Sequence, residues 1–423
     1  MAQSSAKTSI SGGHPILEKE QKSSLLAISM VSFLWSTSSL MVFSVLPSFL
    51  SEELGVNNRG LGIIEGLALL LSFLAKVVAG FASDYFIYRK PLIMSGSVLT
   101  ALAKSGFVFI TGFKSAFLIR FLDRFSKGLR SAPTDALLAD LGSAPNYGFV
   151  FGLRQSLYTS GAVCGAILSM ILLHFFGSNF QLIFVAATFP SILAILLLAK
   201  GVKEKTKFKP CKVYFRLSDF KGFSNSYWAL MLCLAFLMLA RFSEAFITLR
   251  VRELGLQLQF IPMVIVIMDL VHLSVAYPLG KWADQVSREK LLLCGMFVQL
   301  IAALTLASVN DLAGAFMGVV LIGLYMGMTQ GVMRAIIAQH CPEHLRGSGF
   351  ALFYLFSGIS VFGGNYIAGQ LGDEFGLYAA FLGGAVFTGF ALCLYFLQLL
   401  LKSDFLRKYA TLYLFKTRMK LLP

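Results

Sequence analysis

Long apolar segments are the feature that most constrains what this chain can fold into. Twelve stretches are apolar and long enough to cross a hydrocarbon core of about 30 Å as helices of about 20 residues. The alternation of a membrane-spanning strand is absent, and a helix in lipid satisfies its own backbone hydrogen bonds. We therefore expect an all-α integral membrane protein with twelve transmembrane helices. The expected bounds are 24–50, 58–82, 91–113, 115–141, 148–175, 180–200, 227–250, 258–280, 290–309, 312–338, 348–371 and 376–401.

The net charge of +15 is distributed as a topology signal rather than as a nucleic-acid surface. Residues 200–221 carry eight basic and two acidic side chains, and the tail after Leu401 carries six basic ones. The short loops 176–179, 309–311 and 372–375 contain no Lys or Arg. Basic residues collect on the cytoplasmic side, so we expect both termini and the central loop to lie in the cytoplasm. The expected location is the inner (cytoplasmic) membrane.

Two patterns recur in the chain at nearly the same offset. "GFASDYFIYRK" begins at Gly80 and "GKWADQVSREK" begins at Gly280, an offset of 200. Residues 135–140 likewise resemble residues 334–339 at an offset of 199. Repeated spacing indicates two homologous halves. The expected domains are a cytoplasmic tail (1–23), an N-terminal six-helix half (24–200), a basic cytoplasmic linker (201–226), a C-terminal six-helix half (227–401) and a basic cytoplasmic tail (402–423).

The fourth expected helix carries an unusual run of charges, "RFLDRFSKGLRSAPTDALLAD" at 120–140. Helical spacing places five polar side chains on one face: Arg120, Asp123, Lys127, Arg130 and Thr134. Each charge facing lipid near the bilayer centre would cost about 2.5–3.5 kcal/mol, so this face should line an aqueous cavity, with Asp123 pairing with Lys127. The alternative is that the charges only clamp this helix to its neighbours. Pro133 is expected to end or kink the helix.

Further ionisable residues in apolar segments mark a possible path for protons and substrate. Asp269 and His272 are three residues apart, and an imidazole beside a carboxylate can exchange a proton near neutral pH. A static polar contact between helices is the alternative for this pair. For Arg241 and Glu244 a neutral ion pair is the favoured interpretation. The residues that we expect along the path are Glu65, Asp123, Arg124, Lys127, Glu244, Asp269 and His272.

These motifs resemble those of the major facilitator superfamily of transporters, along roughly residues 25–401. "GFASDYFIYRK" is similar to the loop motif between the second and third helices of that family, with Ile87 where a second glycine is usual. Arg124, Lys127 (where Gln is common) and Gly128 are similar to its fourth-helix motif. The longer stretch 122–140, together with "LGIIEG", resembles a bacterial subgroup of drug or metabolite efflux proteins. The resemblance implies two six-helix halves around a central substrate site.

The family resemblance also implies a conformational gate and a bend. Repeated Gly and Asp at helix ends permit close approach and charge pairing, which would hold the halves together in one state and release them in another. The expected gate residues are Gly80, Asp84, Arg89, Gly280 and Asp284. Gly152, Gly161 and Gly165 resemble the antiporter motif of the fifth helix, with Ala166 in place of its proline. Plain small-residue helix packing is the alternative for these glycines.

We therefore expect a secondary active transporter that moves a small organic molecule by alternating access, with proton-coupled efflux as the leading hypothesis. Proton-coupled uptake of a nutrient or siderophore is the alternative, and uniport remains open. The chain carries no GxxxxGK[ST] phosphate-binding loop, and neither a nucleophile–base arrangement nor a selectivity filter, so we expect neither an enzyme nor a channel. "HCPEH" at 340–344 has a proline that breaks helical register, and no metal or cofactor is expected. The expected partners are the substrate, protons and membrane lipids, with no nucleic acid, and the protein is expected to be a monomer.

Overall fold

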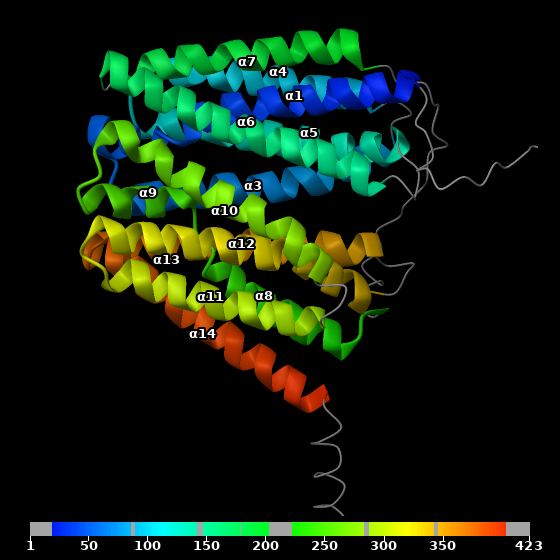
Figure 1. Cartoon of the computed structure of the whole chain (residues 1–423), viewed down its shortest axis with the longest axis vertical. Coiled ribbons are helices and arrows are strands. Elements are labelled where there is room, and N and C mark those ends of the chain that lie inside the picture. The colour runs from blue at the N-terminus through cyan, green and yellow to red at the C-terminus, as the bar shows by residue number, and fades with distance from the viewer. Residues whose placement is uncertain are drawn as a thin grey trace, which may run out of the picture.

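The computed structural model describes residues 19–85, 89–141, 147–177, 179–202, 222–282, 287–341 and 346–402, all of it helices and short connections. The helices run side by side along one direction, with the start of α1 and the end of α14 toward the same end of the bundle (Figure 1). The N-terminal half comprises α1 (Lys19–Phe43), α2 (Leu46–Ser48), a π-helical turn (Phe49–Glu53), α3 (Asn58–Tyr85), α4 (Lys90–Gly106), a 3-10 turn (Phe107–Phe109), α5 (Phe113–Leu141), α6 (Tyr147–Phe176) and α7 (Phe180–Gly201). The C-terminal half comprises α8 (Asn225–Leu239), α9 (Glu244–Glu253), a 3-10 turn (Leu258–Phe260), α10 (Ile261–Trp282), α11 (Arg288–Ser308), α12 (Leu312–His340), α13 (Arg346–Glu374) and α14 (Leu377–Lys402).

The helices match the twelve segments expected from hydropathy. Within the described ranges, eleven spans are long and apolar enough to cross a membrane, and α5 is outside this set because of its charges. The seventh segment is broken, because α8 ends at Leu239 and α9 begins only at Glu244. Ser243 caps α9, accepting a hydrogen bond from the Ala245 amide at 3.3 Å. Of the two outcomes expected at Pro133, an end of the helix is wrong, since α5 continues through it to Leu141, and a kink stays a prediction.

Polar and apolar side chains are arranged as a membrane protein requires. Large apolar side chains on the outer surface are exposed, among them Val78, Phe109 and Phe189. Among the described residues of the N-terminal half, five charged side chains within the helices are instead buried: Glu65, Lys104, Arg120, Asp123 and Arg130. Charges buried inside a helical bundle avoid the hydrocarbon and find partners there. The N-terminal half therefore has a polar interior beneath a lipid-compatible surface.

The two halves make close contact at the end of the bundle away from the start of α1. Asp373 of α13 accepts hydrogen bonds from the backbone amides of Asn58 (2.8 Å) and Arg59 (3.1 Å). It therefore caps α3 from the opposite half, where a carboxylate also complements the helix dipole. Gly62 of α3 packs so tightly on α13 that a Cβ there would collide with the carbonyl oxygen of Asn365. This contact brings α3 and α13 together at one end of the space between the halves.

Candidate functional site

A cavity of about 450 Å³ lies between the halves. Residues of α1, α3, α5 and α6 line it from the N-terminal half, and residues of α8 to α10, α12 and α13 line it from the C-terminal half. Small-molecule sites in proteins have volumes of roughly 300–1,000 Å³, so this cavity can hold a small organic molecule. It is the candidate substrate site.

A buried ion pair forms one wall of the cavity. The Arg120 guanidinium of α5 donates to both carboxylate oxygens of Glu65 on α3, Nε to Oε1 at 2.8 Å and Nη2 to Oε2 at 2.9 Å. This fork-to-carboxylate geometry fixes both side chains and the relative position of the two helices. The guanidinium also stacks over the Phe43 ring of α1, 4.7 Å from its centroid. Glu65, a predicted path residue, is therefore tied into the wall and does not line the cavity.

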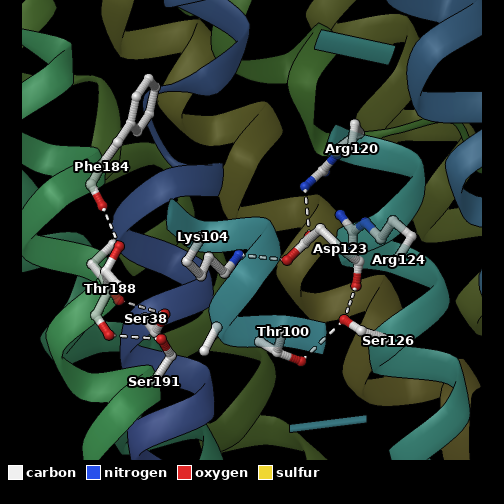
Figure 2. Close-up of polar contacts among 12 residues, drawn as sticks. Ser38, Thr100, Lys104, Arg120, Asp123, Arg124, Ser126, Phe184, Thr188 and Ser191 are labelled. Carbon is white, nitrogen blue, oxygen red and sulfur yellow. Dashed lines mark hydrogen bonds and ion pairs between the residues drawn. The ribbon is translucent and has the colours of Figure 1, made fainter. Parts of the chain in front are cut away.

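Asp123 is held by two cations. Lys104 of α4 places its Nζ 2.6 Å from one carboxylate oxygen, and Arg120 places its Nη1 3.3 Å from the other (Figure 2). The expected pairing of Asp123 with Lys127 is wrong, because α4 is the nearer neighbour of that carboxylate. Lys104 is thus the partner that the sequence did not reveal, although a lysine in an apolar membrane segment, here in the last turn of α4, is a signal that a carboxylate lies close by.

The break between α8 and α9 rests on the same buried network. The Ser243 hydroxyl lies 3.2 Å from Glu65 Oε2, and the Ser243 amide donates to the Asn365 side chain at 2.8 Å. Asn365 in turn donates to the Val361 carbonyl of its own helix at 2.7 Å. These bonds satisfy polar groups freed by the helix break inside the membrane. Through Ser243, the Glu65 carboxylate connects the N-terminal half to the C-terminal half.

Arg124 and Lys127, both predicted path residues, do line the cavity. The Arg124 guanidinium lies over the Phe43 ring at 5.0 Å and only 3.9 Å from Glu65. Its Nε is buried and has no hydrogen-bond partner among the described residues. Lys127 lies near the ring of Tyr158 on α6, 5.9 Å from its centroid. One face of α5 therefore does two things: Arg120 and Asp123 fix it to α3 and α4, whereas Arg124 and Lys127 face the open space.

The charged residues nearer the C-terminal end of α5 hold this helix against its neighbours. Arg130 is buried against the indole of Trp35, 4.2 Å from the ring centroid. Asp135 pairs with Arg154 of α6, with 2.6 Å between Oδ1 and Nη1. Neither Arg130 nor Asp135 lines the cavity. These contacts, like those of Arg120 and Asp123, correspond to the clamping alternative.

Glu244, Asp269 and His272 line the cavity from the C-terminal half. Within the described residues, no ion pair or hydrogen bond joins the side chains of Asp269 and His272, or those of Arg241 and Glu244, so both expected pairs are absent. Glu244 is the first residue of α9, while Arg241 lies in the break before it. Glu244 lies at the start of α9 and Asp269 lies within α10. The C-terminal half therefore presents two carboxylates to the cavity without a fixed cation.

The predicted gate is only partly visible. Arg89 is half-buried and precedes α4 as its N-cap. Gly80 and Asp84 lie in the last turns of α3, and Gly280 lies near the end of α10. Their surroundings, however, are outside the described part of the structure. Asp284 also lies outside the described residues. The charge clamp stays a prediction.

The three glycines predicted to bend the fifth membrane helix lie on α6, which is one continuous helix. Gly161 and Gly165 face the backbone of α1, where an added Cβ would collide with the carbonyl oxygens of Phe33 and Thr37. A Cβ at Gly152 would meet nothing within 4 Å. Two of the three glycines therefore permit close packing of α1 on α6, which is the packing alternative.

Two helical halves with a polar cavity between them define a secondary transporter that works by alternating access. The chain belongs to the Major Facilitator Superfamily, which it matches over residues 26–364 and 230–408. Members of this family are transporters rather than enzymes. The expected fold class is thereby confirmed, as is a multi-pass membrane protein with a small-molecule substrate.

Several known proteins are similar over most of this chain. An uncharacterized transporter of the same family from Methanocaldococcus jannaschii is 26% identical over 362 residues, covering 84% of this chain and 89% of that protein. The solved structure of a bacterial homologue of the human lysosomal transporter Spinster, inward-facing and unoccupied, has a TM-score of 0.72 at 14% identity, covering 90% of this chain and 97% of that one. The nucleoside transporter NupG has a TM-score of 0.74 at 12% identity, covering 90% and 100%. At such identities the solved structures show the shared fold alone.

Proposed function

We propose that this chain is a proton-coupled secondary transporter that exports a small organic molecule across the inner membrane, with both termini in the cytoplasm. The observation that carries the proposal is the pair of carboxylates, Glu244 and Asp269, that line the central cavity without an ion pair among the described residues. A carboxylate in this position can take a proton from one side and release it to the other as access alternates. Ionisable groups inside membrane proteins commonly serve such relays.

Asp123 and Glu65 are less suited to carry a proton in the arrangement described. Asp123 contacts Lys104 and Arg120, while Glu65 contacts Arg120 and Ser243. Protonating either carboxylate would leave a buried cation without its partner, which is costly. We therefore assign proton coupling to Asp269 and Glu244 and a structural role to the Glu65–Arg120–Asp123–Lys104 network.

Alternating access requires contacts between the halves that form in one state and break in the other. The contacts of Asp373 with the start of α3 and of Gly62 with α13 are candidates, because both join the halves at one end of the cavity. With the termini in the cytoplasm, this end is extracytoplasmic and the described state is closed to the outside. The predicted gate at Asp84 and Asp284 would form the opposite closure.

The direction and substrate do not follow from the similar proteins. The similar proteins of known structure differ in kind, because one is a nucleoside transporter and another is a homologue of a lysosomal transporter. We favour export because the α6 glycines resemble the antiporter motif. Proton-coupled uptake is the second candidate, and the same experiment separates the two.

The experiment uses purified protein in vesicles that contain a pH-sensitive dye. Candidate substrates are added outside, and lumenal pH is followed with and without an imposed pH gradient. We expect opposite movement of protons and substrate, and loss of gradient-driven accumulation in the double variant Asp269→Asn/Glu244→Gln with exchange of substrate retained. Glu374→Gln, an acid on α13 outside the cavity, serves as the control. Coupling that survives in the well-folded double variant contradicts the assignment, and movement in the same direction favours uptake.

A further inference from the structure

Positive charge exceeds negative charge in the central cavity. We infer that the transported molecule is an organic anion in which two acidic groups, or one phosphate monoester, are attached to an apolar or aromatic body. This inference rests on the proposed transport function. Six cations and three acids are among the residues that line the cavity, an excess of three positive charges with His272 neutral. The cations are Lys76, Arg120, Arg124, Lys127, Arg241 and Arg334, and the acids are Asp123, Glu244 and Asp269.

The excess of positive charge in the cavity remains when the buried network of Glu65, Arg120, Asp123 and Lys104 is included in the count. Arg120 and Asp123 lie at the edge of the cavity, and their further partners Glu65 and Lys104 contribute one negative and one positive charge. The whole network is therefore neutral by formal charge, with two acids and two bases. The remaining cations are five, against Glu244 and Asp269. Among the described residues none of the five forms an ion pair, apart from the long contact of Arg124 with Glu65 at 3.9 Å.

These cations come from both halves and line the same cavity. Lys76 on α3 and Lys127 on α5 come from the N-terminal half, and Arg334 on α12 comes from the C-terminal half. Arg241 adds a cation from the break between α8 and α9. Like charges facing one another in a site of low dielectric repel strongly, and an anion between them would offset that repulsion.

Arg124 supplies a second, independent observation. Its Nε is buried without a hydrogen-bond partner among the described residues. A buried donor left unsatisfied costs about 1–3 kcal/mol, and more when it is charged. A carboxylate or phosphate oxygen of a bound anion is the acceptor that suits a guanidinium best. Aromatic side chains also line the cavity, among them Phe43, Phe73, Tyr158 and Phe242, and these would contact the body of the same molecule.

A cationic substrate is the principal alternative, since Glu244 and Asp269 also line the site. It would need both carboxylates and would still face five cations, four of which form no ion pair among the described residues while Arg124 has only its long contact with Glu65. An inorganic anion is the other alternative, but a cavity of about 450 Å³ with aromatic walls is much larger than such an ion requires. The charge excess and the aromatic lining together favour an organic anion.

The test uses two dyes with related ring systems and opposite charge. Wild-type protein in nanodiscs is titrated with fluorescein, a dianion in mildly alkaline buffer, and with rhodamine 123, a cation, while fluorescence polarisation is measured. We expect saturable binding of fluorescein and none of rhodamine 123. Arg241→Gln and Arg334→Gln should each weaken fluorescein binding about tenfold or more, as expected for loss of a charged contact. Lys114→Gln, an exposed cation on α5 outside the cavity, should leave the affinity unchanged.

Three outcomes overturn the inference: no binding of fluorescein at millimolar concentration, tighter binding of rhodamine 123, or unchanged fluorescein affinity in both arginine variants. Competition tests the apolar body, since phenyl phosphate should displace fluorescein better than inorganic phosphate does, and equal displacement contradicts that part. Vesicle transport separates this inference from the proposed function. If the protein binds anions but moves no protons, the proposal of proton coupling is contradicted and the anion inference is not. If proton-coupled transport is seen only with neutral or cationic compounds, the anion inference is contradicted and the proposal of coupling is not.

Discussion

Arg120 donates two parallel hydrogen bonds to Glu65, 2.8 and 2.9 Å long. The pair lies inside the membrane-spanning part of the fold, and both side chains are almost completely buried. The pair joins α5 to α3, and the Ser243 hydroxyl of the other half contacts the same carboxylate. Glu65 is therefore the point at which the wall of the cavity meets the broken helix α8–α9. Changes at this pair should affect both the stability of the N-terminal half and its contact with the C-terminal half.

Replacing Glu65 with Gln should destabilise the folded protein strongly. The substitution breaks the buried ion pair and leaves the Arg120 guanidinium only its 3.3 Å contact with Asp123, and removing one partner of a buried ion pair typically costs about 3–5 kcal/mol. The double variant Glu65→Gln/Arg120→Gln should recover part of this loss, because the remaining Asp123 and Lys104 still balance one another. Thermal unfolding in detergent measures both variants. A double variant whose loss equals the sum of the two single losses would show that the pair is not coupled.

Asp123→Asn should lower folded yield and melting temperature, since Lys104 and Arg120 both lose a carboxylate contact. Lys104→Met should restore most of the lost stability in the Asp123→Asn background, because it removes the cation left without a partner. Any folded Asp123→Asn protein should retain proton-driven transport. The measurements are melting temperature and gradient-driven accumulation in vesicles. Normal stability combined with lost coupling would return the proton-carrying role to Asp123.

Gly62→Ala should weaken the closure between α3 and α13. An added Cβ would collide with the Asn365 carbonyl oxygen, so the halves must separate at this end. We expect transport turnover to fall several-fold with less change in melting temperature than for Glu65→Gln, because the collision is absent once the halves separate. Gly152→Ala is the matched control, since its Cβ meets open space and alanine is favoured in a helix by about 1 kcal/mol. Equal turnover in the two variants would argue against the closure.

Impermeant thiol reagents should fail to label Cys211 in intact cells. The basic residues of 200–221 predict that this segment, which lies outside the described residues, is cytoplasmic. A variant that keeps Cys211 as its sole cysteine gives an unambiguous readout, with permeabilised cells as the positive control. Labelling from outside would reverse the proposed orientation and, with it, the side to which the described state is closed.

The sequence by itself determined the architecture. Hydropathy is a sum over neighbouring residues, so the apolar segments could be found without knowing how they pack, and all twelve appear as helices. The charges at 120–130 also had to lie inside the bundle, because lipid would exclude them. Helical spacing correctly placed Arg120 and Asp123 together with Lys127 on the inner side of α5.

Only the tertiary structure decided which charges meet. Glu65 and Arg120 are 55 residues apart, and Glu65 and Ser243 are 178 apart, so nothing local in the chain predicts either contact. Asp123 had a possible partner one turn away in Lys127, yet the packing of α4 against α5 brought Lys104 closer. The break before Glu244 was likewise not evident from hydropathy, and the backbone amide of Ser243 within it finds its acceptor on another helix, at Asn365. The local sequence determines which charged side chains cannot face lipid. The packing of neighbouring helices determines which partner each buried charge contacts.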